Sequence, residues 1–162
     1  MTAFVPVGGL GGGGGGQDAI DGYLSVEPAD VSLGQLLTTT PAKIAWWAHA
    51  GSSGVTASTS TDDLTIVTSG RYNIQCSMSG TGPASAVEWV FEVYVDGASP
   101  GAGMVFGVIR DTAVTAHGSL AFAGELDLTA GQVVTIYGWS DIGGGQTFVP
   151  DYAMFKINRI GA

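Results

Sequence analysis

Residues 71–79 read RYNIQCSMS, and apolar and polar side chains alternate along the whole stretch. Successive side chains of an extended chain point to opposite faces, so Tyr72, Ile74, Cys76 and Met78 fall on one face and polar residues on the other. The stretch therefore predicts a β-strand with one buried face and one wet face, and it makes Cys76 a core residue.

Residues 86–97 read AVEWVFEVYVDG and show the same alternation before a turn at Asp96 and Gly97. The apolar face carries Val87, Trp89, Phe91, Val93 and Val95. The opposite face carries Glu88, Val90, Glu92 and Tyr94. A second strand is predicted here, and its outer face is only half polar.

Six further stretches have strand-like patterns and are separated by Gly, Ser, Asp and Pro turn signals. They span residues 44–50, 63–68, 104–110, 119–128, 132–140 and 152–160. No segment shows a sustained helical period, so the pattern predicts an all-β fold, an antiparallel two-sheet jelly-roll sandwich. The residues predicted to point into its interior are Tyr72, Ile74, Trp89, Phe91, Leu126, Leu128, Phe155 and Ile157.

Three segments of different composition divide the chain. Residues 1–17 form a Gly-rich N-terminal arm that includes the run GGLGGGGGG, which has almost no side chains with which to build a core. Residues 18–42 carry scattered apolar positions interrupted by Pro28, and they are interpreted as a connecting segment. Residues 43–162 hold the predicted strands and form the jelly-roll domain.

Composition narrows the choice of partners. The chain has 162 residues, 14 acidic against 5 basic, and a formal net charge of −9. Phosphate backbones and anionic lipid surfaces are bound through Lys and Arg, and no apolar run is long enough to span a bilayer, so neither nucleic acid nor membrane is expected. The start, MTAFVPVGG, has no secretory pattern and Cys76 is the only cysteine, so we expect synthesis in the cytoplasm without disulfides.

No catalytic constellation stands out. His49 and His117 could be combined with one of the many Ser and Asp residues, but no nucleophile motif accompanies them, and two histidines without a third ligand do not predict zinc. Glu88 and Glu92 lie four residues apart on one strand face, as glycosidase carboxylates or simply as polar surface. We expect no enzyme, no metal and no cofactor, with a carbohydrate-active enzyme as the most distant alternative.

Apolar residues are also abundant on the strand faces opposite the predicted core. They are Trp47, Val90, Tyr94, Val105, Ile109, Val134, Ile136 and Ile160. An exposed patch of that size is normally buried against another subunit, so we interpret these positions as an oligomer interface centred on Tyr94. The alternative is that loops or the N-terminal segment cover them within one chain.

Four stretches resemble the tumour necrosis factor and complement globular-head superfamily. They are LTIVTSGRYNIQCSMSG, VEWVFEVYVDG, LAFAGELDLTAGQVVTIYGWS and FVPDYAMFKINRIGA, and with the rest of residues 44–162 they cover most of the chain. The resemblance implies a trimeric jelly roll, which recurs in bacteriophage head and tail accessory proteins. The glycine run lacks the G-X-Y period of a collagen stalk, unlike many animal members.

These observations together lead to an expected function. The sequence favours a bacteriophage capsid decoration (cement) protein or head fibre, a homotrimer on the outer surface of the virion that binds the major capsid protein. Its arm would attach through the apolar anchors Phe4, Val5, Val7 and Leu10. The alternative is the receptor-binding tip of a tail fibre, in which loops 80–86 and 141–150 would contact a host surface glycan.

Overall fold

A computed structural model of the chain describes residues 20–27, 30, 34–82, 87–101, 106–111 and 117–162. The Gly-rich arm with its predicted anchors Phe4, Val5, Val7 and Leu10 lies outside the described residues, and so does Val105. The described residues contain no α-helix, and hence no helix that is long and apolar enough to cross a membrane.

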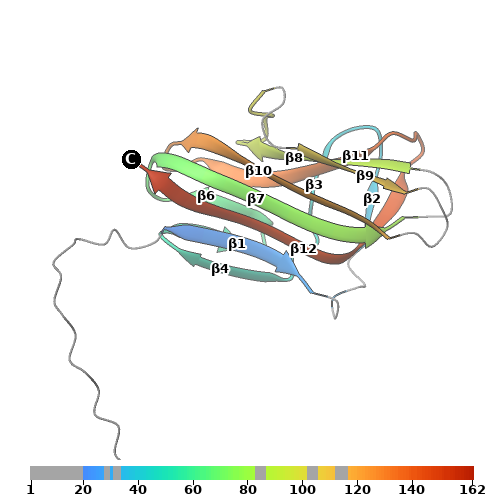
Figure 1. The fold of residues 1–162 in the computed structure, drawn as a ribbon, viewed down its shortest axis with the longest axis horizontal. Helices are drawn as coiled ribbons and strands as arrows, with labels where there is room; N and C mark the ends of the chain where they lie inside the picture. Colours follow the sequence, from blue (N-terminus) through green and yellow to red (C-terminus); the bar gives the residue numbers. More distant parts are fainter. Residues whose placement is uncertain (1–19, 28–29, 31–33, 83–86, 102–105, 112–116) are drawn as a thin grey trace, which may run out of the picture.

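Two antiparallel sheets form the two layers of a sandwich (Figure 1). Sheet 1 has the order β10-β7-β12-β1-β4, and β2 pairs with β12 beside this path. Its strands are β10 (Gly118–Leu128), β7 (Gly70–Thr81), β12 (Gln146–Gly161), β1 (Asp21–Val26), β4 (His49–Ser53) and β2 (Gln35–Leu37). The prediction of an all-β jelly-roll sandwich is confirmed.

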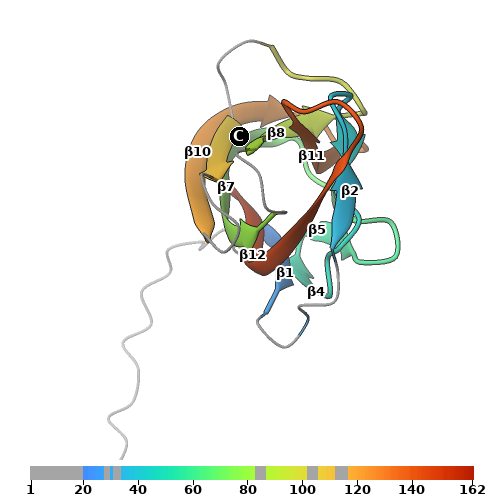
Figure 2. The same cartoon turned by 90° about the vertical axis from the view of Figure 1, so that its right-hand side faces the viewer.

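Sheet 2 has the order β5-β6-β11-β8-β9, and β3 pairs with β11 beside this path. Its strands are β5 (Val55–Ser58), β6 (Asp63–Ile66), β11 (Val133–Ser140), β8 (Val87–Val95), β9 (Phe106–Asp111) and β3 (Ala42–Lys43). Along one side β10 of sheet 1 lies against β9 of sheet 2, so that the end-on view in Figure 2 resembles a closed ring. This closure covers two strand edges that would otherwise offer unpaired backbone groups.

The core lies between the sheets, where the inward side chains of both meet. All eight residues predicted to point inward are buried, from fully enclosed Phe91 to Leu126, which is 9% exposed. At the centre, the Phe148 ring packs against Trp46, Trp89 and Phe91 with ring centroids 5.2–5.4 Å apart. This contact joins β12 of sheet 1 to β8 of sheet 2.

Part of the segment assigned to a connection contributes to the sheets. β1 lies between β12 and β4, and its residues Gly22, Leu24 and Val26 are buried while Tyr23 is exposed. The alternation in DGYLSV is a strand pattern, but its first inward residue is Gly22, which has no apolar side chain to mark the buried face. The described sandwich therefore starts at Asp21 and not at Lys43.

The structure corrects four of the residues assigned to an oligomer interface. Trp47, Ile109, Val134 and Ile136 are each at most 4% exposed within the single chain, so they belong to its core and cannot form an outer surface. In β11 the prediction chose the wrong face, because QVVTIYGWS has apolar residues on both faces and its inward face includes the small residues Gly138 and Ser140.

The other two errors have different causes. Ile109 pairs with inward-facing Trp89 and therefore points inward as well. Residues 44–48 are not a strand, so Trp46 and Trp47 do not alternate and both are buried. Val90 and Tyr94 do lie on the outer face of sheet 2, as predicted, and both are half-buried.

The central aromatic contact should dominate the stability of the fold. We expect Phe148→Ala to lower the free energy of unfolding by about 3–5 kcal/mol, because it removes a fully buried ring and leaves a cavity among three aromatic neighbours. Urea titrations followed by Trp fluorescence measure this change. Leu36→Ala is the control, since Leu36 is 61% exposed and its loss should cost less than about 0.5 kcal/mol. Equal effects of the two substitutions would contradict the assigned core.

Candidate interaction surface

The outer face of sheet 1, the side turned away from sheet 2, can be mapped from the strand registers. Three successive rows of outward side chains cross the sheet from β4 through β1, β12 and β7 to β10. They are His49, Ser25, Met154, Ser77 and Ala121; Gly51, Tyr23, Lys156, Gln75 and Ala123; and Ser53, Asp21, Asn158, Asn73 and Glu125. Small and uncharged side chains predominate in the first two rows.

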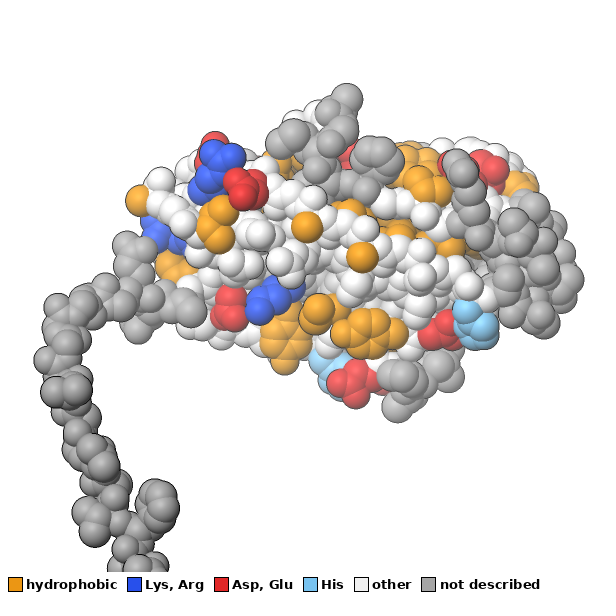
Figure 3. Space-filling view, viewed as in Figure 1, with side chains coloured by type: hydrophobic (Ala, Val, Ile, Leu, Met, Phe, Trp, Pro, Cys, Tyr) orange, Lys and Arg blue, Asp and Glu red, His pale blue; other side chains and the backbone are white. Residues whose placement is uncertain are grey.

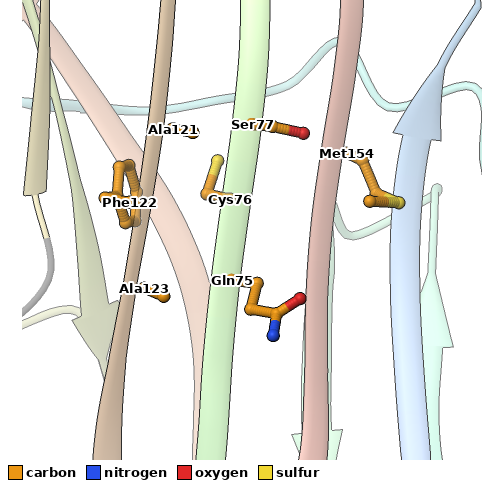
Figure 4. Close-up of a pocket in the computed structure, with 7 residues that line it drawn as sticks. All are labelled: Gln75, Cys76, Ser77, Ala121, Phe122, Ala123 and Met154. Atoms are coloured by element: carbon orange, nitrogen blue, oxygen red, sulfur yellow. The ribbon is translucent and has the colours of Figure 1, made fainter.

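A depression of about 340 Å³ lies in this face over β7 and β10. Figure 4 shows its lining, with Ala121 and Ala123 on β10 and Met154 on β12 at the far side of β7. The residues that line it are Gln75, Cys76, Ser77, Ala121, Phe122, Ala123 and Met154. The hollow exists because the outward side chains of β7 and β10 are short.

Beside the depression, larger side chains of β1 and β12 stand up from the sheet. Tyr23 and Tyr152 are each 40% exposed, and Met154 lies between their positions. The Tyr23 ring leans over Gly51, where a Cβ atom would come within 2.5 Å of the ring, so a larger residue at this position would displace the exposed Tyr23 side chain. We call Tyr23 and Met154 the ridge of this face.

The charges of the face are few and unevenly distributed (Figure 3). Lys156 occupies the middle row and forms no ion pair with any described residue, whereas Arg71 at the edge pairs with Glu125 at 2.8 Å. The outward charges of β10 are all acidic, namely Glu125 and Asp127. Lys156 is flanked by Asp21 of the third row, and the margin of β10 holds Asp127 and the Glu125–Arg71 pair.

Both histidines also lie on this face, each beside an aspartate. His117 Nδ1 lies 2.6 Å from Asp151 Oδ2, and His49 Nε2 lies 3.1 Å from Asp30 Oδ2. Neither imidazole hydrogen-bonds to a serine or cysteine among the described residues, and these residues contain no group of three that could hold a metal ion. No nucleophile and base are brought together in this part of the chain.

The outer face of sheet 2 is a weaker candidate. The rings of Tyr94 and Tyr137 stack on each other with centroids 4.0 Å apart, so Tyr94 is partly buried within its own chain. Burial, with smaller contributions from Glu92 and Tyr137, raises the pKa of Tyr94. Ser99 donates a hydrogen bond to Glu92, which makes this carboxylate part of a surface contact. Stacking on Tyr137 thus reduces the apolar surface that Tyr94 can offer to a partner.

The depression over β7 and β10 is not lined by any residue of the two loops proposed for glycan contact. Residues 83–86 lie outside the described part of the chain, and the turn at Gly144 and Gly145 is held in the left-handed region with Leu36 against it.

Sequence reasoning missed the outer face of sheet 1, because Tyr23 lies in the segment assigned to a connection. The signal was present in DGYLSV, where Tyr23 is the large residue on the polar side of the alternation.

Comparison with known proteins supports the fold alone. No family model matches the chain, and no curated protein matches it either. Among solved structures, the chain is similar to a tumour necrosis factor from S. frugiperda, Eiger, with a TM-score of 0.58 and 11% sequence identity. The match covers 90% of this chain and 94% of that one. The architecture is therefore a jelly roll of the tumour necrosis factor type.

The reactivity of Cys76, the only cysteine of the sequence, provides a test of the packing beneath the depression. Cys76 is 2% exposed, and burial raises the pKa of its thiol far above the usual range. Because the thiolate is the reactive form, we expect Cys76 in the folded protein to resist iodoacetamide at pH 8 and to react only after denaturation. Mass spectrometry of labelled protein provides the measurement. Rapid labelling without denaturant would show that β7 and β10 separate readily.

Proposed function

We propose that this chain is a binding and assembly protein that forms a homotrimer through the outer face of sheet 1, and that it serves as a capsid decoration protein or head fibre of a bacteriophage. The observation that carries the assembly part is the ridge and depression side by side on one sheet face. The number of three chains rests on the resemblance to trimeric jelly rolls. The virion setting rests on the sequence, in particular on the Gly-rich arm.

Shape complementarity supports self-association. Tyr23 and Met154 of the ridge are suited to fill the depression over Ala121 and Ala123 in a second copy of the chain. A contact between different parts of the same face is heterologous, and it closes into a ring when the rotation between copies is a simple fraction of a turn. Small side chains let the two backbones approach closely, as in the well-packed centres of subunit interfaces.

Charge supports the same arrangement. With ridge against depression, Lys156 of one copy would come to the side of the next copy that bears Asp127 and the Glu125–Arg71 pair. Two chains that each carry a net charge of −9 repel each other as they approach. An orientation that brings Lys156 of one chain near the carboxylates at the β10 margin of the next reduces this repulsion and is favoured over others.

The place at which the described residues begin supports attachment by one end. Arg159 N donates a hydrogen bond to Ile20 O, so the chain enters β1 beside the end of β12. The other end of the sandwich holds Gly80 and Gly118, which are paired there, and the turn after Ser140 (Figure 1). An arm that binds a capsid at the first end leaves the second end directed outward.

A charge placed in the depression tests the interface. We expect light scattering to report three chains for the native protein, and we expect Ala121→Glu to shift the assembly to monomers, because a buried unpaired carboxylate costs several kcal/mol. Thr56→Glu is the matched control, since it adds the same charge at an exposed position of β5 and should leave the trimer intact. Circular dichroism checks that both variants fold. If the native protein is a monomer at low micromolar concentration, the proposed assembly is excluded. If it is a dimer, only the proposed number of three chains is excluded.

Removal of the arm tests the capsid role. We expect a chain without residues 1–16 to remain a folded oligomer that no longer cosediments with capsids, because the apolar anchors Phe4, Val5, Val7 and Leu10 are lost while the body is untouched. The full chain run in parallel is the reference. If the shortened chain decorates capsids as tightly as the full chain, the arm is not the attachment element.

A further inference from the structure

A β-bulge interrupts the pairing of β12 with β7 at one end of the outer face of sheet 1. Pro150 pairs with Gly80 and Tyr152 pairs with Ser79, so Asp151 is an extra residue without a counterpart. A bulge re-aims side chains that would otherwise alternate. Here Pro150 is buried, Tyr152 is 40% exposed, and Asp151 reaches His117 beyond the start of β10.

At the bulge, Asp151, which is paired with His117, directly precedes the exposed residue Tyr152. The hydrogen bond between Asp151 Oδ2 and His117 Nδ1, 2.6 Å long, holds the imidazole in place. The His117 side chain is 66% exposed, and its Nε2 has no hydrogen-bond partner among the described residues. When Nδ1 carries the proton and donates it to Asp151, Nε2 is left as an acceptor. Asp151 Oδ1 is likewise not engaged by any described residue, and it is a second acceptor.

The side chain of Tyr152 is 40% exposed on the sheet surface, and its hydroxyl group donates a hydrogen bond to Met154 Sδ at 3.9 Å. The cross-strand neighbour of Tyr152 is Ser79, which is too short to cover it, and Ser79 in turn pairs with Ser119. The site thus combines one partly exposed aromatic side chain with acceptors and hydroxyl groups of neighbouring residues. An aromatic ring offers apolar area at little cost in conformational entropy, and its phenol hydroxyl group adds a polar end.

We propose that Tyr152, Asp151 and His117 bind a neutral saccharide. A pyranose has an apolar C–H face that packs on a ring, and hydroxyl groups at its rim that donate hydrogen bonds to carboxylate and imidazole acceptors. The Asp151 carboxylate disfavours anionic ligands. A metal ion is not favoured, because the described residues offer only these two ligating groups here.

This inference goes beyond the proposed assembly and capsid role. All three residues come from one chain, and they lie beyond the rows that contain the depression. The site therefore does not need the trimer in order to bind. Light scattering on the same samples separates a failure of saccharide binding from a failure of assembly.

The test is a titration of the full chain, labelled with ¹⁵N, with glucose, galactose, mannose and N-acetylglucosamine. A single ring and a few hydrogen bonds give weak affinity, so the titration extends to the order of 10 mM. We expect at least one of these sugars to cause saturable shifts of the Ser79 and Gly118 amide signals. Tyr152→Ala and His117→Gln should each weaken binding by about fivefold or more, the effect of losing one favourable contact.

His49→Gln is the matched control, because His49 is the other histidine of this face and also pairs with an aspartate, Asp30, but has no bulge beside it. It should bind the sugar as the native chain does. Equal weakening by His49→Gln and His117→Gln would overturn the assignment, as would the absence of saturable shifts with all four sugars. Binding of glucuronate alone, with shifts centred on Lys156, would overturn it in favour of an anion site. Asp151→Asn, which keeps the shape of the side chain, provides a second test if Tyr152→Ala does not fold.

Discussion

The contact of Phe148 with Trp46, Trp89 and Phe91 is the interaction on which the rest of the structure depends. It fixes β12 against β8 across the interior, and β12 in turn pairs with β7, β1 and β2. Once β12 is fixed, the period of two decides which of its residues face outward, up to the bulge. The ridge and the proposed saccharide site are therefore consequences of how one strand is held in the core. The Trp46 and Trp89 indole nitrogens are buried without a hydrogen-bond partner among the described residues, which is a cost that this packing must offset.

The small side chains of β7 and β10 need a different explanation from the core. Ala121, Ala123 and Ser77 face away from sheet 2 and bury little within the chain, so the stability of one chain does not require them to be small. Long polar side chains would serve equally well on a surface that only met water. A hollow beside a ridge of comparable extent is useful when another surface must approach closely, and this argument favours a second copy of the chain as the occupant.

Strands with one clearly polar face could be predicted from the sequence in detail. In β7 and β8 the alternation identified the inward residues correctly, because only one assignment buries the aromatic rings. In β11 both faces are apolar, and the prediction placed Val134 and Ile136 outward, although they face inward together with Gly138 and Ser140. Composition alone cannot show which face of such a strand points into the core, because the inward face is determined by the pairing with β8.

Two further features depend on tertiary pairing and could not be found in the pattern. Residues 44–48 look like a strand, but Trp46 and Trp47 are both buried in irregular backbone. The bulge at Asp151 is visible only as a shift of register between β12 and β7. The sequence indicates Tyr152 as the start of a strand and Asp151 as part of a loop, so it separates two residues that the bulge presents together.

The Gly-rich arm and the trimer are linked by an energetic argument. Holding the run GGLGGGGGG in one conformation costs about 1–2 kcal/mol of backbone entropy per residue, and only the few apolar residues around it can offset this cost by burial. A single arm is then a weak ligand for any surface. Three arms on one body bind as linked ligands, and the second and third attach at the effective concentration set by the first. The proposed assembly through sheet 1 would therefore supply the physical condition under which such an arm can attach firmly, and on this proposal the interface on the body matters for attachment as much as the arm itself.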